Sequence, residues 1–483
     1  MNKTRGLFAM VVLVIAACGA SADDLVESSD STTPTTSTAT PSNRAPNEAW
    51  LNAWIINDSG ETAGVIGSDV EVNVQSAEIV EVDGAAFMAV SATGIPNYTH
   101  TITNQDETFL TSRRSSDFTG DGLIISAGDE VAFGEDIGYN STGCTSTDGT
   151  GFGYWPPGPA CPTEQSYDVL FPLSPVLADG GNTSTGLGMI GLWVNGVAIF
   201  GWGDGQSYNN ERVWENLAPV AESYDLDICP GHSAMGTYHH HSYPTCLADQ
   251  LGDTGDSHSP IYGFASDGFP IYGPWVADGV LARSSWTVRD YEDPTSSTGC
   301  GEAGIRSCLL LDQTDPAAGT VATSSIGPTT SDTVTSMSNN VFQATAGYFL
   351  QDYYYESGLN DGTLEALDQF NGHDHDGLGY HYHVTLAVEG DQLVDAFPYY
   401  VGIEFAGVVG DSFAAAEPVN PGGQAPVAPD LSGVASALGV TVEKLERALG
   451  EPPPDLAAAA AELGITEKEL MEALAQSGLG PPP

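Results

Sequence analysis

Eight of the ten histidines fall into two short clusters of similar spelling. The first cluster, CPGHSAMGTYHHHSYPTC, contains His232, His239, His240 and His241, and the second, NGHDHDGLGYHYHVT, contains His373, His375, His381 and His383. On an extended strand, side chains two positions apart point to the same face, roughly 6.5–7 Å apart. His239 with His241, and His381 with His383, would therefore form two imidazole pairs. Four imidazoles that face each other suit zinc, copper or iron, so we predict one shared transition-metal ion, with copper or zinc favoured.

The alternative for these four residues is a structural one, in which buried imidazoles hydrogen-bond to the backbone and to tyrosine hydroxyls. The recurrence of the spacing favours metal ligation. The same alternation turns His240 to the opposite face of its strand, where we expect it to be exposed to solvent.

Four further histidines could add ligands or hydrogen-bond donors to the centre: His232 and His258 in turns, and His373 and His375 in the acidic loop GHDHDG. The carboxylates of that loop, Asp374 and Asp376, could instead help to bind calcium, although the turn chemistry of Asp-Gly also explains them.

Other polar and aromatic residues beside the clusters are candidates for the wall of a pocket. These are Tyr238, Asp267, Tyr272, Trp275, Asp376, Tyr380 and Tyr382. For the three tyrosines that alternate with histidines, core packing is the favoured alternative. Signatures of serine nucleophiles, of zinc-protease helices and of phosphate-binding glycine loops are absent from the sequence, so no catalytic residue is assigned.

The elements that must position these residues read as strands. Between residues 48 and 407, short runs rich in β-branched and aromatic residues are bounded by Gly, Asn, Asp and Pro. We therefore predict a mainly β fold, a large β-sandwich-like or duplicated β body, followed by a small α-helical C-terminal repeat segment.

The C-terminal segment, 430–483, follows a linker at 408–429 and repeats with a period of 25 residues. Each copy has an alanine-rich helix, a Leu-Gly turn, a threonine that can cap the next helix (Thr441, Thr466), and a second amphipathic helix. Its acidic faces argue against DNA binding, and packing or docking at the cell surface fits it better.

The first 18 residues resemble a bacterial lipoprotein signal. Lys3 and Arg5 precede an apolar run that is too short to span a bilayer, and small residues lead into Cys18. We expect Cys18 to carry the lipid anchor and 19–47, rich in Ser, Thr and Pro, to be a disordered linker. The alternative is an ordinary cleaved signal. The protein is thus expected to be exported and lipid-anchored to the outer face of a membrane of the cell envelope.

The remaining six cysteines form three close pairs along the chain, and in an exported protein they are expected to be disulfides. The simplest pairing is Cys144–Cys161, Cys229–Cys246 and Cys300–Cys308. Six cysteines permit 15 pairings, and Cys229 and Cys246 could instead be thiolate metal ligands.

The charge balance is strongly acidic, with 64 acidic residues against 12 basic ones and a formal net charge of −52. Such a surface repels nucleic acid, which excludes a nucleic-acid partner. It attracts cations, although a well-solvated surface suited to a salty environment explains most of these carboxylates.

The motif GYHYHVT at 379–385 is similar to the signature of the YHYH-domain proteins, a group of secreted proteins whose activity is largely uncharacterised. The segments GIPNY, GMIGLWVNGVAIFGWGDG, CPGH, HSPIYGFASDGFPIYGPW and LDQFNGHDHDGLGYHYH resemble that family in kind and order. The resemblance covers 94–405, with the YHYH domain itself at about 165–405. One departure is TYHHHSYP, where His240 replaces an aromatic residue. The double use of the motif suggests an internal duplication, or two strands that converge on one centre.

The sequence thus leads to an exported, surface-anchored protein with a histidine-rich transition-metal site. A metal-free adhesive β module that binds a cell-surface partner is the alternative. A further alternative is a metal-dependent hydrolase with an unknown small-molecule substrate, in which Asp267 or Asp376 acts as the base.

Overall fold

The computed structural model describes residues 48–410, apart from 66–67, 121, 141–153, 157–160, 235 and 391, and scattered positions between 434 and 470. The predicted signal, Cys18 and both linkers therefore lie outside the described residues, except for the first residues of the second linker. In the described part the fold is mainly β, as predicted from the sequence. None of the helices in these ranges is both long enough and apolar enough to cross a membrane.

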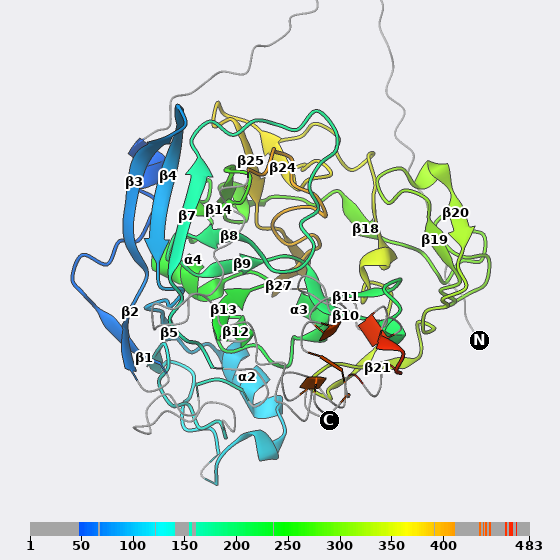
Figure 1. Cartoon of the computed structure of the whole chain (residues 1–483), viewed down its shortest axis with the longest axis horizontal. Helices are drawn as coiled ribbons and strands as arrows, with labels where there is room; N and C mark the ends of the chain where they lie inside the picture. The colour runs from blue at the N-terminus through cyan, green and yellow to red at the C-terminus, as the bar shows by residue number, and fades with distance from the viewer. Residues whose placement is uncertain are drawn as a thin grey trace, which may run out of the picture. The chain divides into compact units, whose positions relative to one another are not determined.

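An eight-stranded sheet lies at the centre of the described chain, in the order β12-β13-β9-β8-β14-β15-β25-β24. Its strands are β8 (Met189–Trp193), β9 (Ala198–Phe200), β12 (Gly231–Ala234), β13 (Thr237–His240), β14 (Ile261–Ala265), β15 (Pro270–Tyr272), β24 (Gly372–Asp374) and β25 (Tyr380–His383). The hairpins β12–β13 and β24–β25, which carry most of the histidines, lie at opposite ends of the sheet (Figure 1).

The two halves of this sheet have the same topology. In the first half β8 and β9 form one hairpin, β12 and β13 form another, and β13 runs parallel to β9. In the second half β14–β15 and β24–β25 are the hairpins, and β25 runs parallel to β15. The halves join through the antiparallel pair β8–β14. The sheet is therefore a duplicated one, which was one of the two forms of β body expected from the sequence.

The two inner hairpins also turn in the same way. The N–H of Gly196 donates to the carbonyl of Trp193, and the N–H of Gly268 donates to that of Ala265, both at 2.8 Å. Both glycines have positive φ, 80° and 88°, a region that glycine adopts without strain. A β-carbon on Gly196 would also lie 2.6 Å from the Cβ of Ala92, so glycine is needed there for packing as well.

A second layer, the three-stranded sheet β3 (Val74–Val82), β4 (Ala85–Ala92) and β7 (Tyr167–Pro172), packs against the central sheet through an aromatic cluster. Figure 1 shows these three strands side by side. Trp54 stacks on Phe264 of β14 with ring centroids 5.3 Å apart, and Phe171 of β7 lies 5.8 Å from both rings. Burial of these large rings on both sheets gives the sandwich-like arrangement.

The other elements are short, and the remaining strands pair two by two. These strands are β1 (Thr62–Val65), β2 (Ser68–Glu71), β5 (Thr99–Thr101), β6 (Glu130–Ala132), β10 (Gly203–Ser207), β11 (Glu215–Leu217), β16 (Trp275–Ala277), β17 (Val280–Leu281), β18 (Trp286–Val288), β19 (Cys308–Leu310), β20 (Thr320–Ala322), β21 (Thr333–Thr335), β22 (Val341–Gln343), β23 (Tyr353–Tyr355), β26 (Leu386–Glu389) and β27 (Gln392–Asp395). The helices are α1 (Glu48–Leu51), α2 (Asn104–Ser112), α3 (Ala218–Ala221) and α4 (Thr245–Leu251), with 3-10 turns η1 (Ser115–Asp117), η2 (Tyr208–Asn210), η3 (Pro316–Ala318) and η4 (Leu350–Asp352).

Two of the three predicted disulfides are confirmed. Cys229 is bonded to Cys246 and Cys300 to Cys308, with Cα atoms 5.2 and 5.4 Å apart. The first of these bridges joins the segment before β12 to α4, and it removes both of its cysteines as thiolate metal ligands. Cys144, the predicted partner of Cys161, lies outside the described residues.

The described positions of the C-terminal segment contain an apolar cluster of their own. Its buried members are Val434, Ala435, Leu445, Ala459, Ala460, Leu463 and Leu470. They come from both copies of the 25-residue repeat. Thr441 caps its helix as predicted, because its hydroxyl oxygen accepts the N–H of Lys444 at 3.2 Å.

Candidate metal centres

The first centre consists of His232, His239 and His241, whose Nε2 atoms converge in the interior. The antiparallel register places His232 of β12 opposite His239 of β13, and strand alternation puts His241 on the same face. The Nε2 atom of His239 lies 3.0 Å from that of His232 and 3.0 Å from that of His241. All three side chains are buried.

A carboxylate lies beside two of these three imidazoles. Glu222, directly after α3, places its Oε2 3.1 Å from Nε2 of His232 and 3.3 Å from Nε2 of His241. The three imidazoles alone have ligand atoms within 4.8 Å of one another, and they suit zinc or copper; Glu222 is a neighbouring carboxylate that could add an oxygen ligand. Sequence reasoning did not identify Glu222, because it lies ten residues before the first histidine and carries no local signal.

Backbone carbonyls fix which ring nitrogen carries the proton. Nδ1–H of His239 donates to the carbonyl of Thr237 at 2.9 Å, and Nδ1–H of His241 donates to that of Gly201 at 2.6 Å. In a neutral imidazole the other nitrogen, Nε2, then has only a lone pair. Two lone pairs that face each other at 3.0 Å repel unless a cation lies between them. Two ligands held about 2.0–2.1 Å from one tetrahedral zinc ion lie about 3.3–3.4 Å apart, slightly more than the 3.0 Å between these Nε2 atoms.

Burial keeps these imidazoles neutral, the form that binds metal. It lowers the pKa of His232 to about 4 and that of His239 well below its usual value. Burial also lowers the pKa of His241, although the nearby Glu222 opposes the effect. The pKa of Glu222 itself is raised by burial to about 7. A bound cation would reverse that last shift by stabilising the carboxylate.

The second centre consists of His258, His375, His381 and His383, whose ligand nitrogens all lie within 4.8 Å of one another. His381 and His383 are on β25, whereas His258 precedes β14 and His375 follows β24. The rings of His381 and His383 have centroids 5.0 Å apart. His373, opposite His381 on β24, lies beside them with its ring 5.0 Å from that of His381.

The second centre is anchored by carbonyls in the same way as the first. Nδ1–H donates at 2.7 Å from His381 to Gly379, from His383 to Gly273, and from His258 to Ser259. The Nε2 atoms of these three histidines are buried without a hydrogen-bond partner, as is that of His373. A buried polar atom without a partner costs about 1–3 kcal/mol, and a metal ion would satisfy all of them at once.

Burial lowers the pKa values here too. They fall to about 4 for His373 and about 3 for His381, and well below the usual value for His383. Neighbouring imidazoles add to the effect, because each would repel a second positive charge. These histidines are therefore neutral at pH 7 and able to ligate a metal ion.

The two centres are equivalent positions of the duplicated sheet. His232, His239 and His241 of the first half correspond to His373, His381 and His383 of the second, by register and by anchoring carbonyl. The sequence signal for this correspondence is the pair of segments DICPGH at 227–232 and DQFNGH at 368–373.

The aspartates of those segments brace the two hairpins. One carboxylate oxygen of Asp227 accepts the N–H groups of Cys229 and Gly231 at 2.8 and 2.9 Å, and the other accepts the hydroxyl of Tyr238 at 2.7 Å. Asp368 makes the equivalent bonds to Phe370, Gly372 and Tyr380, at 2.9–3.1 Å. Sequence reasoning missed both aspartates, although their spacing before Gly-His could have revealed them.

The prediction that four histidines share one ion is wrong. The pairs His239–His241 and His381–His383 belong to different centres. Strands β9, β8, β14 and β15 lie between β13 and β25, which makes five steps of about 4.8 Å, or about 24 Å. Strand alternation gave the correct face for each pair, but it cannot say which strands become neighbours.

The expectation that His240 is exposed is also wrong. Its side chain does point away from His239 and His241, but it is fully buried, and its Nε2–H donates to the carbonyl of Cys229 at 3.1 Å. His240 corresponds to Tyr382 of the second half, so both halves place a ring in the core at this position.

Three of the tyrosines proposed for a pocket wall, Tyr238, Tyr380 and Tyr382, are held by hydrogen bonds to aspartates, and only Tyr380 is partly exposed. The hydroxyl of Tyr382 donates to Asp267 at 2.5 Å, as those of Tyr238 and Tyr380 do to their aspartates. Asp267 is fully buried and also accepts the N–H of Gly407 at 2.9 Å. These contacts make Asp267 a structural acceptor and leave it poorly placed to act as a base.

Two other candidates do lie beside the second centre. The ring of Tyr272 is 4.8 Å from that of His381 and 4.9 Å from that of His258. Asp376 is exposed, with Oδ2 3.4 Å from Nδ1 of His375. Trp275 packs on Gly255 instead, where a β-carbon would lie 2.6 Å from its ring. Asp374 is exposed.

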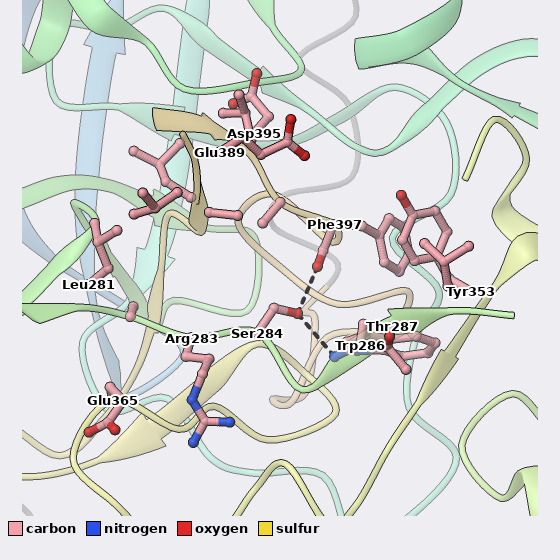
Figure 2. Close-up of a pocket in the computed structure, with 17 residues that line it drawn as sticks. Leu281, Arg283, Ser284, Trp286, Thr287, Tyr353, Glu365, Glu389, Asp395 and Phe397 are labelled. Carbon is pink, nitrogen blue, oxygen red and sulfur yellow. Dashed lines mark hydrogen bonds between the residues drawn. The ribbon is translucent and has the colours of Figure 1, made fainter. Parts of the chain in front are cut away.

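A cavity of about 520 Å³ lies elsewhere and is drawn in Figure 2. Trp286, Tyr353 and Phe397 line one part of it, with Arg283 and Glu365 in another. Its residues include none of the histidines of either centre and none of the residues predicted to line a pocket.

Comparison with known proteins found a match to one family model. The family model described as "YHYH protein" matches residues 168–389, a range that contains both candidate metal centres and lies within the limits expected for the domain. No curated protein and no solved structure matches the chain. The chain therefore contains a YHYH domain, which carries both histidine hairpins.

Proposed function

We propose that this YHYH-domain protein binds two transition-metal ions, one in each centre. The observation that carries the proposal is the pair of Nε2 atoms of His239 and His241, which face each other at 3.0 Å while both Nδ1–H groups donate to carbonyls. Only a cation between them makes that arrangement favourable when both rings are neutral.

The donor types support zinc or copper. Neutral imidazoles suit both metals, whereas calcium takes six to eight oxygen ligands. The carboxylates predicted for a calcium loop, Asp374 and Asp376, are exposed. Because Cys229, Cys246, Cys300 and Cys308 are in disulfides, no thiolate from them competes for a soft ion.

The proposed location is the outer face of a membrane, with the protein attached through lipidated Cys18. The disulfides support an oxidising compartment, and the net charge of −52 would raise the local concentration of cations.

Metal analysis of the protein, purified without an affinity tag, tests the proposal. We expect two transition-metal ions per chain, and a melting temperature that falls when a chelator removes them. The proposal would be refuted if the native protein contains no metal and its melting temperature does not change when copper, zinc, iron or manganese is added. That result would favour the metal-free binding module.

A further inference from the structure

The two halves share three equivalent histidines, but His373 of the second half lies beside its centre and not among its four members, and the two centres differ in what completes them. In the first centre the added donor is the carboxylate of Glu222, and the hairpin position equivalent to His375 is Ala234, which has no ligand atom. In the second centre the added donors are two imidazoles, His258 and His375. The side chains of His232 in the first centre and of His375 in the second are equally exposed, at 9% each, so burial does not distinguish them.

His375 differs from the other ligands of its centre in how it is held. His258, His381 and His383 each donate Nδ1–H to a carbonyl at 2.7 Å, but neither nitrogen of His375 has a hydrogen-bond partner. The charged group nearest to it is the carboxylate of Asp376, whose Oδ2 lies 3.4 Å from Nδ1 of His375. The side chain of Asp376 is 76% exposed.

His375 also lies on an irregular segment. It follows β24 in the loop 375–379, where Asp376 and Gly377 have positive φ and are exposed. The other ligands of the centre are on β25 or beside the start of β14. Moving His375 would therefore break no hydrogen bond of its imidazole and no strand pairing.

We infer that His375 is a displaceable ligand, so that the second centre, unlike the first, can bind an external ligand at its metal ion. This inference rests on the proposed function. When the nitrogen of His375 leaves the ion, an external lone-pair donor, a small anion or a neutral nitrogen or oxygen ligand, takes the position. The exchange transfers no electrons. The first centre, closed by Glu222, keeps its ion and its ligands.

Zinc release tests the difference between the centres without any mutation. The zinc-loaded protein is mixed with an excess of a coloured zinc chelator, and release is followed with time. We expect one zinc per chain to leave at least about tenfold faster than the other, because tuning a ligand changes metal affinity about 10–100-fold. Two zinc ions that leave at the same rate would overturn the inference while the proposed function stands.

The variant His375→Ala identifies the ligand responsible. Its fast zinc should leave about 10–100-fold faster still, and added imidazole should slow the release by filling the vacant position. The matched control is Asp374→Ala, an exposed neighbour on the same segment, which should release zinc like the wild type. Equal rates of zinc release from His375→Ala and Asp374→Ala would overturn the role of His375.

Azide tests for the open position directly. In the copper(II)-loaded wild type, azide should change the electron paramagnetic resonance signal of one copper per chain, and in His375→Ala it should do so at about tenfold lower concentration. Azide binding to both coppers, or to neither, would overturn the inference. A chain that binds no metal would overturn the proposed function together with it.

Discussion

Replacing His239 and His241 with alanine should remove one of two bound ions and leave the other in place. Replacing His381 and His383 should do the reverse. This follows from the separation of the centres, because no ligand of one lies near the other. If all four histidines held one ion, either pair of substitutions would remove all the metal.

The size of the effect follows from linkage. At a free-metal concentration a thousandfold above Kd, each ion stabilises the fold by about 4 kcal/mol, through RT ln(1 + [L]/Kd). The centres are about 24 Å apart by strand count, and perturbations more than about 7–10 Å apart usually add. Each double variant should therefore lose about 4 kcal/mol of the metal-dependent stabilisation, and the quadruple variant about 8 kcal/mol.

Denaturant unfolding with and without metal measures this quantity in each variant. Taking the difference within one variant cancels the cost of the cavity that alanine leaves. Metal content, measured on the same samples, should fall from two ions to one and then to none. The reasoning would be refuted if the quadruple variant loses no more metal-dependent stabilisation than either double variant. That result would mean that the four histidines bind one ion.

His240→Ala is the control for the loss of a buried imidazole from the same strand. Its side chain is fully buried in the core, so the substitution should destabilise the metal-free protein by about 2–4 kcal/mol. Metal content should stay at two ions per chain, because its Nε2 donates to a carbonyl and does not face the first centre.

Three other perturbations test separate parts of the molecule. Burial lowers the pKa of His100, but hydrogen bonds to Asp106 and Asp249 outweigh that effect and raise it to about 9. The raised pKa should therefore add to the free energy of unfolding a contribution that is complete below pH 6.5 and lost as pH rises through about 9. His100→Asn should remove this pH dependence of stability. An unchanged dependence in the variant would contradict the assignment of the raised pKa to His100. Cys18→Ser should move the protein from the membrane fraction to the soluble one, because the lipid supplies the retention, and unchanged fractionation in the native host would reject the anchor. A chain cut after Pro421 should still unfold cooperatively, since the helical repeats bury an apolar cluster of their own, whereas aggregation would show that they cover part of the β body.

The strand period was enough to predict which side chains share a face. It placed His239 with His241 and His381 with His383, and it turned His240 to the other side. The close spacing of cysteines predicted Cys229–Cys246 and Cys300–Cys308. These features are local, and short-range geometry decides them.

The features that were missed depend on the order of strands in the sheet. Whether β13 meets β25 is decided by β8 and β14, which pair with each other and keep the two hairpins at opposite ends. Glu222 reaches the first centre from the end of a four-residue helix, and no periodicity predicts that approach. The burial of His240 also depends on tertiary packing, since rings of Tyr98, Trp193 and Tyr238 surround it.

The source of the anchoring hydrogen bonds explains how two halves with different sequences keep the same three histidines. The acceptors are main-chain carbonyls, those of Thr237 and Gly201 in the first half and of Gly379 and Gly273 in the second. Their positions depend on strand pairing, which tolerates changes of side chain as long as the register is kept. The ligands outside the strands have no such constraint, because α3 and the loop after β24 can differ without disturbing the sheet. The duplicated sheet therefore fixes three equivalent histidines in each half and leaves the neighbouring donors free to differ, and the proposed ligands Glu222 and His375 are where the two candidate centres differ.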